Sequence, residues 1–288
     1  MQFARSHIEQ DGASLVEFTL STEVRAVAEA AVKEIAGGYE INPPCRTPKN
    51  EVGFQHRWIQ MRSNDSLAYF YSGSAAFAQP MTPSLTTLMQ IVNQTVGAAY
   101  NAALINKYAP CDYISAHSDS EGGLDKQAGV FMISLGAERS FRITKNQSAV
   151  EEVCVVRTKH CQALQMRGAK FQSRYKHGVA AEKRAVGDRI SITFRCHDPS
   201  KDAAQMEKYE KGIVAKYRKE HPVTLPTLAS AWGGRAPAVE QLAPGVEALI
   251  DHAVALNTIP LADPKVPLDE PGAKKRKLED NRATSSTQ

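Results

Sequence analysis

The run RISITFR, residues 189–195, indicates a β-strand, and with it the class of fold. Four similar short runs precede it: VFMISL (130–135), SFRIT (140–144), VCVVR (153–157) and ALQM (163–166). Several short strands separated by turns are typical of a β-sandwich or a jelly roll. The sequence therefore predicts a β core that begins at about residue 104.

Two helices are predicted ahead of these strands. Residues 21–38 start with an N-cap, Ser21 or Thr22, and continue with apolar side chains at helical spacing. Gly37 is the stop signal of this helix. The second helix starts at Thr82 with a proline in its first turn, and its apolar residues repeat at the same spacing. We expect an α+β fold in which these helices support the β core.

The chain changes character after residue 196. Residues 201–221 predict a charged helix, and a weaker helical pattern follows at 237–256. From residue 257 onward the chain is rich in proline, charge and small polar residues, so we expect disorder there. The basic cluster KKRK, from Lys274 to Lys277, resembles a nuclear-localisation signal and favours a nuclear protein over a cytoplasmic one.

Composition favours an intracellular globular protein. The 288 residues are enough for a full core, and 42% of them are hydrophobic. No apolar run approaches the roughly 18 residues that a membrane span needs, and the first residues lack the apolar segment of a secretion signal. The five cysteines are odd in number and form no CxxC pair, which argues against a disulfide framework or a zinc ribbon.

Basic residues concentrate in one region, although the net charge is only +4. Nine Lys or Arg lie between Arg157 and Arg189, against two acidic residues, Glu182 and Asp188. Such a run fits a polyanionic partner, and it also fits an ordinary solvated face. The sequence leaves both interpretations open.

A short polar run, CDYISAHSDSE at residues 111–121, carries a candidate metal site. On an extended segment, His117 and Asp119 point to the same face because strand side chains alternate. A ferrous centre uses two histidines and one carboxylate, and His177 is available sixty residues downstream. By itself, a His-x-Asp pair is more often part of a solvated loop than of a metal site.

Further polar residues have the spacing of a binding face. Arg189 and Arg195 are six residues apart, so both lie on one face of their strand, where they can meet the two carboxylates of a small diacid. Asn106 and Tyr108, in the run LINKY, repeat the two-residue spacing upstream of His117.

Taken together, the runs LINKY, HSDSE, KHG and RISITFR resemble the AlkB family of Fe(II)/2-oxoglutarate-dependent nucleic-acid dioxygenases, over roughly residues 48–196. The resemblance implies a double-stranded β-helix (jelly-roll) core, with Fe(II) as the metal and 2-oxoglutarate as co-substrate. It implies three catalytic iron ligands, namely His117, Asp119 and His177. It also implies six residues that bind 2-oxoglutarate, namely Asn106, Tyr108, Arg189, Ser191, Thr193 and Arg195.

The resemblance extends to the substrate. The run YFYSG at 69–73 is similar to a family motif that implies contact of Tyr69, Tyr71 and Ser72 with a flipped base, and Glu121 matches a position that contacts an exocyclic amine. A base taken out of its stack needs an aromatic plane and a hydrogen-bond partner, which these residues supply. The alternative is that Tyr69 and Tyr71 form the exposed face of an edge strand.

The sequence departs from the family pattern at three places. Ser191 stands where the family often has asparagine, and Ser120 replaces a second acid that often follows the iron-binding aspartate. The segment between residues 38 and 48 is shorter than in members that act on duplexes and place a hydrophobic wedge there. An insertion after residue 54, QHRWIQMRSND, partly replaces it and offers Trp58 as a substitute wedge.

The sequence thus predicts a dioxygenase that demethylates N-alkylated bases such as 1-methyladenine and 3-methylcytosine in DNA, releases formaldehyde and so repairs alkylation damage. RNA demethylation, or hydroxylation of a nucleic-acid base, is the alternative with the same chemistry, and a binding module with a degenerate iron site is a third possibility. We expect a monomer that acts on DNA or RNA carrying alkylated bases, without a membrane. The predicted parts are an N-terminal strand and helix (1–47), the dioxygenase core (48–198), a helical extension (199–256) and a basic tail (257–288).

Overall fold

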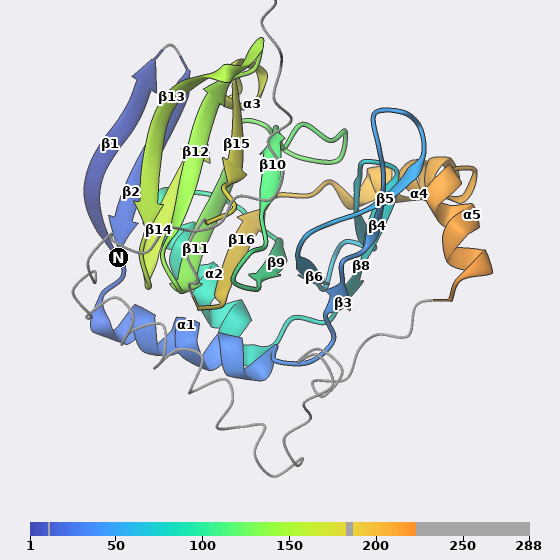
Figure 1. The fold of residues 1–288 in the computed structure, drawn as a ribbon. Coiled ribbons are helices and arrows are strands. Elements are labelled where there is room, and N and C mark those ends of the chain that lie inside the picture. The colour runs from blue at the N-terminus through green and yellow to red at the C-terminus, as the bar shows by residue number, and fades with distance from the viewer. Residues whose placement is uncertain (11, 183–186, 223–288) are drawn as a thin grey trace, which may run out of the picture. The chain divides into compact units, whose positions relative to one another are not determined.

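Two β-sheets form the centre of the fold in the computed structural model, which describes residues 1–10, 12–182 and 187–222 (Figure 1). In the larger sheet the strand order is β1-β2-β14-β11-β16-β9-β6-β8-β7, with β3 beside β6. In the smaller sheet it is β10-β15-β12-β13, and β4 and β5 form a separate pair. The predicted helix at 237–256 and the tail with its Lys274 to Lys277 cluster lie outside the described residues.

The elements have the following bounds. The strands of the larger sheet are β1 (Gln2–Gln10), β2 (Ala13–Thr19), β3 (Glu40–Ile41), β6 (Trp58–Ser63), β7 (Ala68–Tyr71), β8 (Ser74–Gln79), β9 (Ala102–Tyr108), β11 (Val130–Gly136), β14 (Gln162–Arg167) and β16 (Arg189–Arg195). The other strands are β4 (Pro44–Arg46), β5 (Val52–Phe54), β10 (Ile114–His117), β12 (Arg139–Lys145), β13 (Ser148–Thr158) and β15 (Tyr175–Val179). The helices are α1 (Thr22–Glu34), α2 (Pro83–Val96), α3 (Phe171–Arg174), α4 (Asp202–Glu210) and α5 (Ile213–Glu220), with a 3₁₀ turn η1 (Pro199–Lys201).

Strand β16 shows how the sequence builds this core. Because strand side chains alternate, Ile190, Ile192 and Phe194 share one face, and they join the apolar cluster that includes buried residues of α1 and α2. The residues between them are polar and lie on the opposite face, yet all seven positions of β16 are buried. A central strand covered on both sides therefore carries a polar strip into the interior of the protein.

The α+β prediction is confirmed, and both predicted helices form. The helix α1 ends at Glu34, before the predicted stop at Gly37. The expectation that the β core begins at about residue 104 is wrong, because β1, β2 and four of the six short strands between α1 and α2 belong to the larger sheet. A strand ahead of α1 was expected, and two strands form there. Those six strands have at most six residues each, too few for a clear alternating pattern to show in the sequence.

The charged segment 201–221 forms two helices instead of the single predicted one. α4 ends at Glu210, and Gly212 is the N-cap of α5 in an extended conformation, which no helix can continue through. All five cysteines are free thiols, as the odd count predicts. None of the described helices is long and apolar enough to cross a membrane.

Two glycines with nearly equal φ give a test of how tightly the sheet packs. A Cβ at Gly129 (φ +64°), just before β11, would lie 2.0 Å from the carbonyl oxygen of Met166 on β14, whereas a Cβ at Gly97 (φ +63°) would meet nothing within 4 Å. We expect Gly97→Ala to lower the free energy of unfolding by about 1–2 kcal/mol, because a residue with a Cβ pays this cost in a left-handed backbone conformation. Gly129→Ala adds a clash with the backbone of β14, so it should lower the free energy of unfolding, measured with urea, by clearly more. Equal losses of stability in the two variants would contradict the packing of β11 on β14.

Candidate active site

Two paired strands and one loop bring three potential metal ligands together. His117 ends β10 and lies directly opposite His177 of β15 in the antiparallel register, with ring centroids 4.3 Å apart. Asp119 follows in the loop after β10. Each of the three residues offers one ligand atom, and these atoms lie within 4.8 Å of one another. Residues sixty positions apart thus form one cluster because their strands pair.

The surroundings hold these groups in the protonation states that bind a metal. The Nε2 atoms of His117 and His177 lie 3.7 Å and 3.8 Å from the two carboxylate oxygens of Asp119. Burial lowers the pKa of His177 to about 3, and burial also lowers the pKa of His117. Burial raises the pKa of Asp119, but Arg195 and the two histidines outweigh it and keep that pKa well below its usual value. Neutral imidazoles and an ionised carboxylate are the forms that coordinate metals.

Hydrogen bonds orient the ligands. Nδ1 of His117 lies 2.9 Å from the carbonyl oxygen of Ser115, so Nδ1 donates and Nε2 keeps its lone pair. The backbone N–H of Asp119 donates to Oε1 of Gln172 (2.8 Å), and Nη2 of Arg195 donates to Oδ2 of Asp119 (2.9 Å). The other oxygen, Oδ1, is buried without a hydrogen-bond partner among the described residues. A cation bound between the three ligands would satisfy it, so these residues fit a divalent metal.

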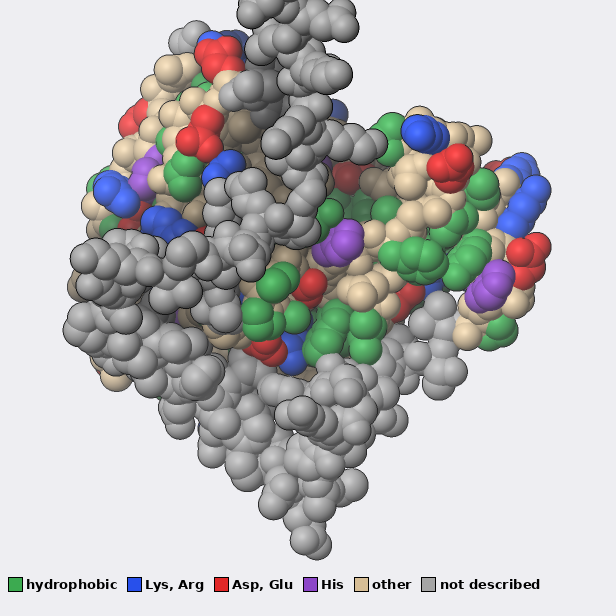
Figure 2. Space-filling model, in the orientation of Figure 1, with side chains coloured by type: hydrophobic (Ala, Val, Ile, Leu, Met, Phe, Trp, Pro, Cys, Tyr) green, Lys and Arg blue, Asp and Glu red, His purple; other side chains and the backbone are tan. Residues whose placement is uncertain are grey.

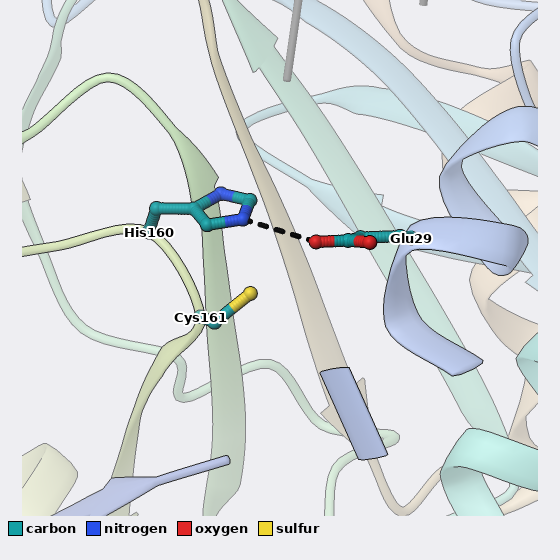
Figure 3. A group of neighbouring side chains, drawn as sticks. All are labelled: Glu29, His160 and Cys161. Atoms are coloured by element: carbon teal, nitrogen blue, oxygen red, sulfur yellow. Dashed lines mark hydrogen bonds and ion pairs between the residues drawn. The ribbon is translucent and has the colours of Figure 1, made fainter. Parts of the chain in front are cut away.

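A second cluster of potential ligands, Glu29, His160 and Cys161, does not have this character (Figure 3). Nδ1 of His160 accepts from the backbone N–H of Gly136 (3.0 Å), which leaves Nε2 protonated and facing Oε1 of Glu29 at 3.3 Å. Burial raises the pKa of the Cys161 thiol to about 12. Because neither ring nitrogen has a free lone pair and the sulfur is protonated, this cluster ties the β13–β14 turn to α1 and does not suit a metal.

The residues expected to bind 2-oxoglutarate lie on the polar face of β16 and on its neighbour β9. In the register, Arg189 pairs with Tyr108 and Ser191 pairs with Asn106. The expected set is buried, as Asn106, Tyr108, Arg189, Ser191, Thr193 and Arg195 are each at most 6% exposed. The Arg189 guanidinium lies 5.2 Å from the centre of the Tyr108 ring. The structure therefore brings all six positions onto two adjacent strands.

The two arginines of this face have N–H groups without hydrogen-bond partners among the described residues. Nε of Arg189 donates to Oγ of Ser134 (3.0 Å), whereas its Nη1 is buried without a partner among the described residues. Nε and Nη1 of Arg195 are likewise buried and unpaired within that part of the chain. Burial lowers the pKa of Arg189 to about 10, so it stays charged at neutral pH. Two buried cations with unpaired N–H groups fit a dicarboxylate such as 2-oxoglutarate.

A cavity of about 390 Å³ opens beside the metal ligands. Its lining includes several residues expected at the site, namely Tyr69, Tyr71, Ser72, Asn106, His117, Glu121 and Arg195. Tyr108, Arg189, Ser191 and Thr193 do not line it. Figure 2 shows hydrophobic side chains and a histidine on the face of the molecule between β10 and the β4–β5 pair. The cavity thus connects one metal ligand to the residues expected to contact a base.

The two tyrosines do not form the exposed face of an edge strand. Tyr69 and Tyr71 are only 4% and 9% exposed, and their rings stack on each other with centroids 4.9 Å apart. The Tyr69 hydroxyl is hydrogen-bonded to Glu121, whose Oε2 is buried without a partner among the described residues. Burial, reinforced by the charge of Asp119, raises the pKa of Glu121 to about 7.

The cavity lining also includes residues that were not expected as site residues, among them Gln55, His56, Arg57 and Tyr113. Nε2 of Gln55 donates to the Tyr71 hydroxyl (2.9 Å), Nε of Arg57 donates to Oδ1 of Asn106 (3.0 Å), and the His56 ring stacks on Tyr113 with centroids 4.6 Å apart. The only signal in the sequence was that three of them belong to the insertion after residue 54. Trp58, the candidate wedge, is partly buried and packs against the apolar core.

Metal binding distinguishes the two clusters. Asp119→Ala removes the one oxygen ligand of three, and losing a residue that merely hydrogen-bonds to a ligand already costs about 10–100-fold in metal affinity. We expect Asp119→Ala to hold little Fe(II) after anaerobic reconstitution and desalting, as measured by iron content. Glu29→Gln, the matched change at the second cluster, should retain the iron of the unmodified protein. Loss of iron in Glu29→Gln alone would reverse the assignment.

The chain is similar in sequence to curated proteins. The chain is 28% identical over 141 residues to "DNA oxidative demethylase ALKBH2" of Mus musculus, which covers 47% of this chain and 59% of that protein. It is 31% identical over 138 residues to "Alpha-ketoglutarate-dependent dioxygenase alkB homolog 3" of Homo sapiens, which covers 45% and 48%. The chain spans about half the length of these relatives.

The chain is also similar to a solved structure and to a family model. The solved structure of OsALKBH1 superposes with a TM-score of 0.46 at 16% identity, over 65% of this chain and 99% of that one, too weakly to carry an argument. The model of the 2OG-Fe(II) oxygenase superfamily matches residues 23–195, more than half of the chain. Together with the curated relatives, this match confirms the resemblance to the AlkB family, and it identifies Fe(II) and 2-oxoglutarate as the cofactors. The chain belongs to the 2OG-Fe(II) oxygenase superfamily.

Proposed function

We propose that this protein removes N-linked methyl groups from bases such as 1-methyladenine and 3-methylcytosine in DNA, and so reverses alkylation damage. The observation that carries the proposal is that one cavity is lined by the metal ligand His117, by the tyrosine stack and by Glu121. A flipped base needs an aromatic contact and a partner for its edge, next to the metal that reacts with its methyl group. One of the curated relatives is named a DNA oxidative demethylase.

The chain's own residues provide the positions for the reactants. His117, Asp119 and His177 would hold Fe(II), and Arg189 and Arg195 would meet the two carboxylates of 2-oxoglutarate. When bound, Fe(II) would supply the oxidation chemistry: with dioxygen as the oxidant, 2-oxoglutarate would be decarboxylated to succinate, the methyl carbon of the base would be hydroxylated, and formaldehyde would leave the restored base nitrogen. Arg195 also donates to Asp119, so this one side chain would fix the position of the carboxylate ligand relative to that of the co-substrate.

Glu121 and the tyrosines would orient the base. Burial raises the pKa of the Tyr69 hydroxyl well above its usual value, so it stays protonated and can donate to Glu121. This bond fixes the carboxyl group, and Oε2 of Glu121 has no hydrogen-bond partner in the part of the chain that the structure describes. An exocyclic amine of adenine or cytosine is a donor that would satisfy that oxygen. Tyr71 is in turn fixed by the hydrogen bond from Gln55.

The test is turnover on a set of oligonucleotides. Methylated DNA and RNA, each single- and double-stranded, are incubated with the Fe(II)-loaded protein and 2-oxoglutarate, and released formaldehyde is measured. We expect the highest turnover on DNA, and near-complete loss of it in Asp119→Ala. Preference for RNA would move the substrate to the alternative class, and intact methyl groups on every substrate with fully loaded protein would refute demethylation. A nuclear location and a monomeric state belong to the same proposal.

A single carboxylate tests base recognition. At a pH above the Glu121 pKa of about 7 the carboxyl is mostly ionised, and Glu121→Gln then keeps the shape of the side chain but removes its charge. A hydrogen bond to a charged group is worth about 1.5–3 kcal/mol. We expect kcat/KM on methylated oligonucleotides to fall by about 10–100-fold. Glu210→Gln on the exposed end of α4 makes the same chemical change away from the cavity and should leave kcat/KM unaltered. Equal kcat/KM in the two variants would remove Glu121 from the substrate site.

A further inference from the structure

Two arginines of the basic run between residues 157 and 189 are already engaged within the protein. Arg157 is ion-paired with Glu138 (2.6 Å) and Glu182 (2.9 Å), so its charge is already balanced. Arg189 is fully buried in the polar face of β16. Two basic residues of the run, at 183 and 184, lie outside the described residues. A phosphate site is therefore to be identified from the surroundings of each individual lysine. Lys176 is one candidate, because it lines a cavity.

This second cavity, of about 400 Å³, lies behind the loop that carries Asp119. Its lining consists of Ser118, Ser120, Lys126, Asn146, Ala169, Gln172, Ser173 and Lys176. All but the alanine bear a side chain that can donate a hydrogen bond, two are cationic, and no carboxylate is among them. The acidic neighbour Asp125 accepts from the backbone N–H groups of residues 127 and 128. Such a lining is suited to an oxyanion.

Gln172 gives independent evidence for a ligand. The side chain is 3% exposed, and its Oε1 accepts from the backbone N–H of Asp119 (2.8 Å). This bond fixes which end of the amide is nitrogen. Nε2 is then a buried donor without a partner among the described residues. A buried donor left unpaired costs about 1–3 kcal/mol, so an acceptor bound in the cavity would remove a real penalty.

The position of the cavity indicates where that acceptor comes from. Ser118 lines both this cavity and the catalytic one, so the two cavities are neighbours. A nucleic-acid strand whose base enters the catalytic cavity carries a phosphate on each side of that nucleotide, and a neighbouring cavity lined by hydrogen-bond donors is suited to receive one. We propose that the cavity between Lys126, Lys176 and Gln172 holds a backbone phosphate next to the flipped nucleotide. This inference rests on the proposed nucleic-acid substrate.

A phosphate bound in this cavity would connect the nucleic-acid strand to the metal site through Gln172. A phosphate bonded to Nε2 of Gln172 would order the same amide whose Oε1 holds the backbone of Asp119. The lysines would supply the sequence-independent part of the affinity. Recognition of the strand and placement of a metal ligand would thus share one side chain.

The experiment measures binding of a methylated single-stranded DNA by the 288-residue chain. It uses a set of otherwise identical oligonucleotides in which one neutral methylphosphonate linkage is moved along the strand. We expect one linkage, next to the modified base, to weaken binding by about tenfold. The double variant Lys126→Gln/Lys176→Gln should bind the natural strand about tenfold more weakly and lose its sensitivity to that linkage. Its salt dependence should fall by about 0.7 in log–log slope for one phosphate contact on a single strand.

The matched control is Lys216→Gln/Lys219→Gln, which removes the same charge from exposed positions of α5. It should keep the linkage sensitivity of the unmodified protein. Circular dichroism and thermal unfolding check that both double variants are folded, and Lys126→Gln alone gives a second test at an exposed position.

Each outcome decides the proposal. Loss of linkage sensitivity only in Lys126→Gln/Lys176→Gln supports it, even if formaldehyde is released from no substrate, in which case the proposed demethylation fails and the phosphate site stands. Equal behaviour of the two double variants, or no linkage sensitivity in the unmodified protein, overturns it. Millimolar inorganic phosphate that binds this cavity without competing with the strand would show a site for free phosphate and would also overturn it.

Discussion

The buried ion pair between Arg195 and Asp119 is the interaction on which the rest of the site depends. The two side chains are 5% and 1% exposed, and Nη2 of Arg195 lies 2.9 Å from Oδ2 of Asp119. A charge buried so deeply needs a partner of opposite charge, so neither residue can be placed without the other. The pair joins β16 of the larger sheet to the loop after β10 of the smaller sheet. The Arg195 guanidinium also lies 4.4 Å from the centre of the Tyr69 ring, which extends the connection to the cavity.

The polar strip on β16 and β9 is a cost to stability that ligands can offset. Proteins satisfy nearly all buried polar groups, and the exceptions gather at functional sites. Among the described residues, the unpaired atoms include N–H groups of Arg189 and Arg195, one oxygen of Asp119 and one oxygen of Glu121. The donors suit carboxylates, and the Asp119 oxygen suits a cation. These arginine and aspartate atoms therefore match the cofactors of the superfamily, whereas the Glu121 oxygen remains available to another ligand.

The C-terminal helices α4 and α5 support the wall of the cavity that carries the tyrosines. Arg218 of α5 forms an ion pair with Glu40 of β3 (2.6 Å), and both side chains are mostly buried. Tyr209 of α4 packs against Phe70, the residue between the two stacked tyrosines. The helices α4 and α5 are therefore part of the structure around the site. They contact β3, β4, β5, β7 and β8, which are among the strands too short for a clear alternating pattern in the sequence.

The sequence by itself determined the helices α1 and α2, the later strands and the order of the ligand and arginine positions, because propensity and periodicity are local properties. Only the tertiary structure decided that His117 faces His177, that Tyr69 and Tyr71 are buried, and that Gln55 and His56 line the cavity. It also decided that Arg157 forms ion pairs with Glu138 and Glu182. These facts depend on strand pairing and register between residues tens of positions apart. A one-residue slip in register would turn every side chain to the other face, and no local pattern reports which pairing occurs.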